Sequence, residues 1–206
     1  MKANPKKPIF WGAACALALL VMGCGTTSPR VQYYTLAPVS GSSPSGAGPA
    51  KWLVAVRPVS VPDVLKRPQI LIRTGENTVT VSDFQRWAGS FDQDVTRVLV
   101  QNLHALLQDV GAAAALDVVV PEPHWVVAVY LTRFDGRPEE SVVLHATWSL
   151  KAQKTRSETV LKESVITEQC DAPGYEGLAA AQSRALAALS REIAAEIKKR
   201  IASAGL

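Results

Sequence analysis

The clearest pattern along the chain is the alternation of apolar and polar residues over positions 141–153. Successive side chains of a β-strand point to opposite faces, so this alternation predicts a strand with one apolar and one polar face. The apolar positions, which we expect to face the core, are Val142, Leu144, Ala146, Trp148 and Leu150. The polar positions, expected to face outward, are His145, Thr147, Ser149 and Lys151.

Shorter apolar runs bounded by turn residues predict further strands. They cover residues 32–36, 52–59, 69–74, 78–81, 116–120, 124–134 and 159–168. Gly75, Glu76 and Asn77 form the predicted turn between the third and the fourth of these runs. The run at 124–134 begins apolar on both faces, which is typical of a strand in the middle of a sheet.

Two segments carry apolar residues at helical spacing. The first helix is predicted to begin at Ser82, which forms a capping-box pattern with Gln85. Its stripe is Phe84, Trp87, Phe91, Val95, Val98, Asn102 and Leu106, widened by Ala88, Leu99, Leu103 and Leu107. The second helix covers residues 175–202, with Leu178, Ala185, Leu189, Ile193, Ile197 and Ile201 on one side. Together these elements predict an α+β fold, in which one mixed, largely antiparallel sheet carries both long helices on one face.

The first residues of the chain have the pattern of a secretory signal. Three lysines precede an apolar run over residues 9–22, which is shorter than the roughly twenty residues of a membrane span. The run ends in Val21-Met22-Gly23-Cys24, which is similar to a bacterial lipobox. We therefore expect residues 1–23 to be a lipoprotein signal peptide and Cys24 to carry a covalent lipid. A plain signal peptide followed by an incidental cysteine is the alternative.

The residue after the lipobox cysteine bears on the membrane that is reached. In Gram-negative bacteria an aspartate at this place retains a lipoprotein in the inner membrane. Gly25 stands there instead, which predicts the periplasmic face of the outer membrane. Residues 24–31 would form a lipidated tether, and residues 32–206 a single domain interrupted by a flexible loop, rich in Gly, Ser and Pro, at 37–51.

Removal of the signal peptide changes the charge balance. The whole chain has 22 basic and 18 acidic residues, and Lys2, Lys6 and Lys7 would leave with the signal peptide. The mature chain would then hold 19 basic residues against 18 acidic ones. Binding to nucleic acid needs a basic surface to neutralise phosphates, so we expect no nucleic-acid partner.

Residues that could carry chemistry are few and scattered. His104, His124 and His145 have no partner at the spacing of metal ligands, so no metal site and no cofactor beyond the lipid on Cys24 are expected. Cys170 would be the only thiol left in the mature domain, and a structural or incidental role is favoured over a nucleophilic one. No nucleophile elbow, phosphate-binding loop or zinc-protease motif is present. The sequence thus indicates no catalytic residues and a protein that is not an enzyme.

Three short motifs resemble those of a known family. They are Tyr-Tyr-Thr-Leu at residues 33–36, the arginine-flanked run at 67–79 and Phe-Gln-Arg-Trp-Ala-Gly-Ser-Phe at 84–91. Placed after a lipobox, they resemble the ABC-type transport auxiliary lipoprotein family over essentially the whole mature chain. One departure is Gly89-Ser90-Phe91, where the family pattern would have Glu-Pro-Leu.

The resemblance implies a function without catalysis. Such lipoproteins are the outer-membrane component of systems in which an MCE-domain protein spans the periplasm and moves lipids between the membranes. The lipoprotein would dock that protein, as a homo-oligomeric ring in one arrangement, and support membrane integrity. The candidate partner-binding residues are Arg67, Arg73, Arg86 and Trp87, since Arg and Trp dominate interface hot spots.

Other interpretations of the same residues stay open. The arginines could instead cap strand ends or pair with Asp63, Asp83 or Asp92, and Trp87 could be a core residue. At the level of function, the alternatives are a free-standing structural lipoprotein of envelope assembly and, third, a periplasmic hydrolase.

Overall fold

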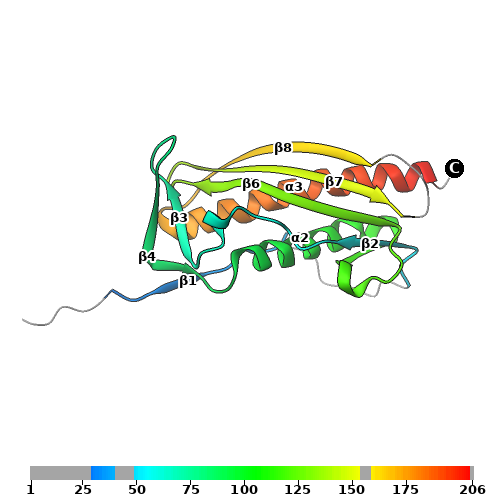
Figure 1. The fold of residues 1–206 in the computed structure, drawn as a ribbon, viewed down its shortest axis with the longest axis horizontal. Helices are drawn as coiled ribbons and strands as arrows, with labels where there is room; N and C mark the ends of the chain where they lie inside the picture. The colour runs from blue at the N-terminus through cyan, green and yellow to red at the C-terminus, as the bar shows by residue number, and fades with distance from the viewer. Residues whose placement is uncertain (1–28, 40–48, 154–158, 205–206) are drawn as a thin grey trace, which may run out of the picture. The chain divides into compact units, whose positions relative to one another are not determined.

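The long strand β6 (Trp125–Gly136) is the centre of the fold in the computed structural model, which describes residues 29–39, 49–153 and 159–204 (Figure 1). One edge of β6 pairs antiparallel along its length with β7 (Ser141–Ala152). The other edge is shared by two parallel strands. β2 (Trp52–Val56) lies beside the first residues of β6, and β3 (Gln69–Arg73) meets its last residue, Gly136.

The remaining strands extend this sheet on both sides. β8 (Val160–Gln169) pairs antiparallel with β7, and β5 (Ala112–Leu116) pairs parallel with β2. β4 (Val79–Trp87) forms a hairpin with β3, and the short β1 (Gln32–Tyr34) lies parallel to the end of β4. The described residues therefore form one mixed sheet of eight strands.

Two long helices, α2 (Phe91–Leu107) and α3 (Gly174–Ala204), pack against each other and against the sheet. α3 contacts β7 and β8, whereas α2 contacts β5. Three short 3-10 helices, η1 (Asp63–Leu65), η2 (Gln108–Val110) and η3 (Asp117–Val119), connect the elements. The predicted α+β class, with two helices and a mixed sheet, is confirmed.

The alternation predicted for 141–153 is also confirmed. The side chains of Val142, Leu144, Ala146, Trp148 and Leu150 are buried in β7, in the same core cluster as α3 residues such as Leu186 and Ile193. His145, Thr147 and Ser149 are half-buried and Lys151 is exposed. The face of β7 that meets the helices is thus the apolar one.

The start of the first helix was predicted wrongly. Residues 82–87 continue strand β4, and α2 begins at Phe91, after Gly89 and Ser90. The amide of Gln85 does bond the hydroxyl of Ser82, at 3.2 Å, but inside an irregular stretch of β4. Residues 85–87 pair with β1, and these strand contacts override the local helical pattern.

A second error concerns residues 116–120, predicted as a strand. The strand found in this region is β5, which begins at Ala112, four residues before the predicted start. Residues 117–119 form η3. A run of alanines has low strand propensity, which is why the sequence pattern gave no signal there. In the fold, Ala112 and Ala114 are buried, and their small side chains let α2 pack closely on this strand.

The segment after β1 is fixed to both helices. The amide of Leu36 donates to Asp94 Oδ2 at 2.6 Å, and that of Ala37 to Ser183 Oγ at 3.0 Å. The amide of Val39 donates to Asn102 Oδ1 at 2.8 Å. We call residues 36–39 the N-terminal arm. Asn102, which the sequence placed on the apolar stripe of α2, is fully buried because it holds this arm.

Several predictions fall outside the described residues. They are the signal peptide at 1–23, the lipid on Cys24, the tether up to residue 28 and residues 40–48 of the predicted loop at 37–51. The described ends of that loop make backbone contacts, since Lys51 donates its amide to the carbonyl of Gly111 at 2.9 Å.

Candidate partner-binding surface

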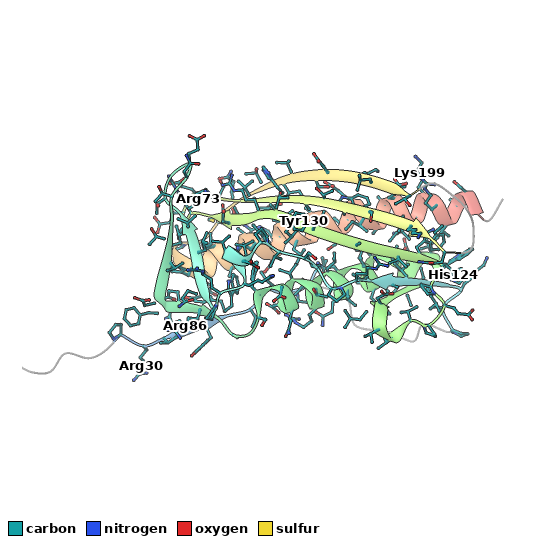
Figure 2. All side chains as sticks on the ribbon, in the orientation of Figure 1. Arg30, Arg73, Arg86, His124, Tyr130 and Lys199 are labelled. Atoms are coloured by element: carbon teal, nitrogen blue, oxygen red, sulfur yellow. The ribbon has the colours of Figure 1, made fainter. Side chains whose placement is uncertain are left out.

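The four candidate residues lie at one end of the domain but in different surroundings. Figure 2 shows Arg73 and Arg86 at the end opposite His124 and Lys199. Arg67, Arg86 and Trp87 come together where β3 begins and β4 ends, because Gln69 pairs with Arg86 and the amide of Trp87 donates to the carbonyl of Pro68 at 2.7 Å. Arg73 lies at the other end of β3, about 13 Å away at ~3.3 Å per residue.

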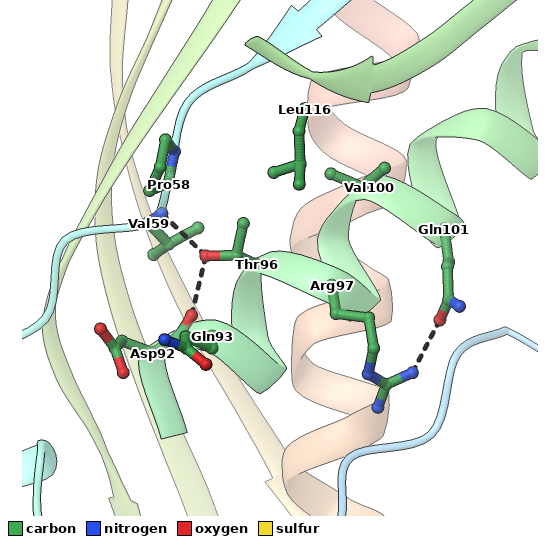
Figure 3. A pocket seen from close by; sticks show the side chains of 9 residues that line it. All are labelled: Pro58, Val59, Asp92, Gln93, Thr96, Arg97, Val100, Gln101 and Leu116. Atoms are coloured by element: carbon green, nitrogen blue, oxygen red, sulfur yellow. Dashed lines mark hydrogen bonds between the residues drawn. The ribbon is translucent and has the colours of Figure 1, made fainter. Parts of the chain in front are cut away.

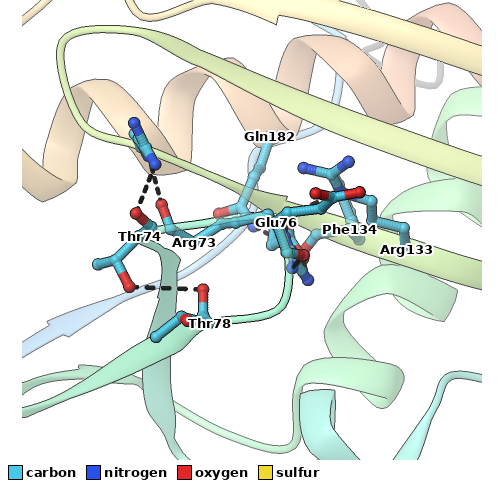
Figure 4. Close-up of polar contacts among 9 residues, drawn as sticks. Arg73, Thr74, Glu76, Thr78, Arg133, Phe134 and Gln182 are labelled. Carbon is cyan, nitrogen blue, oxygen red and sulfur yellow. Dashed lines mark hydrogen bonds and ion pairs between the residues drawn. The ribbon is translucent and has the colours of Figure 1, made fainter.

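Arg73 is bound to a buried carboxylate. Its Nε donates to Asp135 Oδ1 at 2.9 Å, and its Nη2 donates to Oδ2 at 2.7 Å. Figure 4 shows Arg73 together with Glu76 and Arg133, which belong to the same group of polar contacts. Arg73 Nη1 donates to the carbonyl of Glu76 in the hairpin turn, at 2.9 Å. Arg133 Nε reaches the same carboxylate at 2.8 Å. Arg73 therefore joins the β3–β4 hairpin to the central strand, and the pairing with Asp63, Asp83 or Asp92 considered from the sequence is replaced by Asp135.

The two arginines determine the ionisation of Asp135. Burial would raise the pKa of this carboxyl, whose side chain is 4% exposed. Hydrogen bonds from Arg73 and Arg133, together with their positive charges, outweigh burial and hold the pKa below its ordinary value. Asp135 is thus a carboxylate at neutral pH, and its bond raises the pKa of the Arg73 guanidinium. Sequence spacing gave no sign of this contact, which spans 62 residues.

Trp87 is a core residue. It is 6% exposed, and its ring centroid lies 4.8 Å from that of Phe91, which in turn lies 5.6 Å from Phe134. Gln182 of α3 lies beside this aromatic group, and its Nε2 donates to the carbonyl of Phe134 at 3.4 Å. Trp87 therefore fixes the start of α2 against the end of β4, and any effect it has on a partner passes through that packing.

Arg67 and Arg86 differ in how far they are exposed. Arg67 is exposed, and Arg86 is half-buried. Arg86 Nε donates to the backbone carbonyl of Asp83 at 3.1 Å, so its contact with Asp83 does not involve the carboxylate. Two guanidinium groups at the start of β3 and the end of β4 give this part of the surface a positive, hydrogen-bond-donating character.

A groove of about 650 Å³ lies along the outer side of α2 (Figure 3). Val59 donates its amide to Thr96 Oγ1 at 2.9 Å, and the Thr96 hydroxyl donates to the carbonyl of Asp92 at 2.7 Å. At the rim, Arg97 Nη1 donates to Gln101 Oε1 at 2.9 Å. These polar groups are used in contacts within the protein, and the groove does not contain a nucleophile with an adjacent base.

Two of the three histidines, His104 and His124, and the cysteine Cys170 are also in structural positions. His104 Nδ1 lies 3.3 Å from the carbonyl of Ala114, and His124 Nδ1 accepts the amide of Leu53 at 3.2 Å. Burial raises the pKa of the Cys170 thiol, which donates to the carbonyl of Arg137. A protonated thiol is a poor nucleophile. Over residues 29–39, 49–153 and 159–204, no group of His, Cys, Asp and Glu could hold a metal ion.

The comparison with known families gives these observations a context. Residues 34–194 match the family described as the ABC-type transport auxiliary lipoprotein component. The chain belongs to this family. Its members are auxiliary lipoproteins of transport systems, so the chain is an envelope lipoprotein with protein partners. No helix in the described part of the chain is both long and apolar enough to span a membrane.

Two curated relatives agree with this family, and two solved structures share its fold. The chain is 28% identical over 148 residues to the intermembrane transport lipoprotein PqiC of Escherichia coli K12. This alignment covers 66% of this chain and 71% of PqiC. PqiC of Shigella flexneri gives the same values. A crystal structure of an uncharacterised protein has a TM-score of 0.69 at 24% identity, over 82% of this chain and 99% of that one. A Xanthomonas campestris protein has a TM-score of 0.61 at 15% identity, over 79% and 92% of the two chains. These two structures share the fold.

Proposed function

We propose that the protein is the outer-membrane lipoprotein of a system that moves lipids between two membranes. In this role it docks a periplasm-spanning MCE-domain protein and supports membrane integrity. The observation that carries the proposal is the family match over residues 34–194, together with a relative that is named an intermembrane transport lipoprotein. The lipobox at Cys24 and the glycine that follows it support anchoring in the outer membrane.

The proposed docking surface is centred on Arg67 and Arg86. Arg67 is exposed and Arg86 is half-buried, and Arg is among the residues that contribute most to protein interfaces. Trp87 supports this surface from the core, and Arg73 holds the hairpin that carries it. In this arrangement the first two residues touch the partner, whereas the other two position them.

Affinity purification tests the proposal. The tagged lipoprotein is purified from its own envelope in mild detergent, and the proteins that accompany it are identified by mass spectrometry. We expect an MCE-domain protein with the wild type and its loss with Arg67→Ala or Arg86→Ala. Arg191→Ala is the matched control, since Arg191 is an exposed arginine on α3. We also expect outer-membrane fractionation that is abolished by Cys24→Ala.

Two outcomes would contradict the proposal. Recovery of the lipoprotein alone, or with envelope-assembly factors only, would favour a free-standing structural lipoprotein. Recovery of the MCE-domain protein with undiminished yield from both arginine variants would keep the transport role but would place the docking surface elsewhere.

A further inference from the structure

An apolar patch lies on the pair of strands β1 and β4, at the end of the domain that carries Arg86 (Figure 2). Tyr33 is 63% exposed, Phe84 is 42% exposed and Val31 is 39% exposed. Tyr33 and Phe84 lie on the paired strands and Val31 directly precedes β1, so the three exposed side chains form one group close to the start of the described chain. Other exposed apolar residues, such as Leu161 and Val165 of β8, lie elsewhere. We call Val31, Tyr33 and Phe84 the β1–β4 patch.

The contacts of Tyr34, the residue after Tyr33, show that the aromatic ring on the other side of β1 is packed. Tyr34 points the other way, where its ring lies 6.4 Å from that of Tyr175 and its hydroxyl donates to Gln85 Oε1 at 2.6 Å. Tyr33 pairs in register with Arg86, and residues paired in this way share a face of the sheet. The Tyr33 and Arg86 side chains therefore lie on the same face of the sheet as the patch.

The length of the chain before β1 limits how far the patch can lie from a lipid on Cys24. Only six residues separate Cys24 from Val31. At ~3.5 Å per residue, seven steps allow at most roughly 25 Å between the lipidated residue and the patch. Val31 and Tyr33 are the first large apolar residues described after Cys24, so a lipid on Cys24 would keep them within this reach of the bilayer. Tyrosine rings and arginine side chains favour the region of the lipid headgroups, where rings contact acyl chains and guanidinium groups bind phosphates.

We propose that the β1–β4 patch lies against the bilayer that holds the lipid anchor. The inference rests on the proposed function, since it requires a lipid on Cys24. Contact through three exposed apolar side chains would hold the domain in one orientation, with the end that carries His124 and Lys199 away from the membrane (Figure 2). Arg86 then lies at the margin of the patch, where the lipid headgroups and a docked protein would meet.

The test uses the full-length lipoprotein, purified in mild detergent and reconstituted into liposomes of phosphatidylethanolamine and phosphatidylglycerol. An environment-sensitive fluorophore is attached at Tyr33→Cys or at Phe84→Cys, in a Cys170→Ser background. Lys199→Cys is the matched control, because Lys199 is exposed at the opposite end of the domain. Two label sites are used because the Tyr33→Cys variant keeps Phe84 and the Phe84→Cys variant keeps Tyr33.

We expect a blue shift of emission, and loss of most of the quenching by iodide, at positions 33 and 84 but not at 199. Emission typical of water at all three positions, from protein that floats with the liposomes, would overturn the inference. So would a shift at 33 and 84 that appears only when the MCE-domain protein is added, because the patch would then be a protein interface. If the protein does not float, the lipid anchor itself is wrong, and flotation distinguishes that failure from the other two.

Discussion

Arg73 and Arg86 lie on one hairpin and have the same side chain, yet their environments differ. Arg73 contacts both oxygens of a carboxylate that is 4% exposed, and it also binds the carbonyl of Glu76. Arg86 makes its described contact with one backbone carbonyl, that of Asp83, on the rim of the domain. Breaking the first contact leaves a buried charge short of a partner, whereas breaking the second exposes a carbonyl to water.

One arginine motif in the sequence thus contains two side chains with different contacts. One arginine stabilises the fold by joining two strands that are distant in the chain. The other, in the function proposed above, binds a partner. Stability and binding measurements on the two residues should therefore give opposite results.

The largest expected effect belongs to Arg73→Ala. Removing this side chain leaves Asp135 buried with Arg133 as its remaining cation, so we expect the free energy of unfolding to fall by about 3 kcal/mol. Chemical denaturation followed by tryptophan fluorescence measures the change. The double variant Arg73→Ala/Asp135→Asn should recover part of the loss, because the unpaired charge is then absent. A loss below about 0.5 kcal/mol would mean that the contact contributes no more than a surface ion pair.

Acid should weaken the same contact. The pKa of Asp135 is lowered in the folded protein, so its stabilising contribution is complete above the unfolded value of about 3.9 and is lost as the pH falls through the folded value. We expect the free energy of unfolding to decline below about pH 4. Asp135→Asn should be less stable at neutral pH and should show a shallower decline in acid. Parallel acid profiles for the two proteins would contradict this assignment.

Arg86→Ala should change the free energy of unfolding by less than about 0.5 kcal/mol, as surface substitutions commonly do. Its expected effect is on capture of the MCE-domain protein, which should be lost. Thermal unfolding and affinity purification of the same preparation measure the two properties together. A large loss of stability would mean that Arg86, like Arg73, stabilises the fold.

The smallest effect on folding is expected for Tyr33→Ser. Its ring is largely in solvent, so the free energy of unfolding should again change by less than about 0.5 kcal/mol. In liposomes, however, a fluorophore at Phe84→Cys should become more accessible to iodide when Tyr33 is replaced, because the patch has lost its most exposed ring. Unchanged quenching would show that Tyr33 does not contribute to the membrane contact.

The sequence predicted those parts of the fold in which local pattern and tertiary packing agree. The alternation of β7 and the stripe of α3 are of this kind, since each has one apolar face and that face is buried. The start of α2 was missed because Ser82 and Gln85 satisfy a helix rule locally, while β1 and β3 pair with the same stretch from elsewhere in the chain. Strand pairing between distant segments leaves no local signal.

The candidate site was predictable to a smaller extent. The motifs around Arg67, Arg73 and Arg86 named residues that lie at one end of the domain, but they did not show that Arg73 binds a buried carboxylate whereas Arg86 binds a backbone carbonyl. Asp135 lies between Phe134 and Gly136 in an apolar strand, and nothing in its neighbours marks it as the partner of Arg73. The exposure of Tyr33 next to the packed Tyr34 likewise depends on how β1 sits on β4.

The N-terminal arm has a mechanical consequence. Because β1 runs parallel to β4 and the arm continues onto α2 and α3, a force applied at residue 30 along the chain would load the β1–β4 hydrogen bonds in shear. Bonds loaded in shear must break together, whereas bonds loaded as a zipper break one at a time. Beyond β1, the force would act on the hydrogen bonds from the N-terminal arm to Asp94, Asn102 and Ser183. These three residues belong to α2 and α3. Traction on the N-terminus would thus be borne by the whole helical layer rather than by one edge strand.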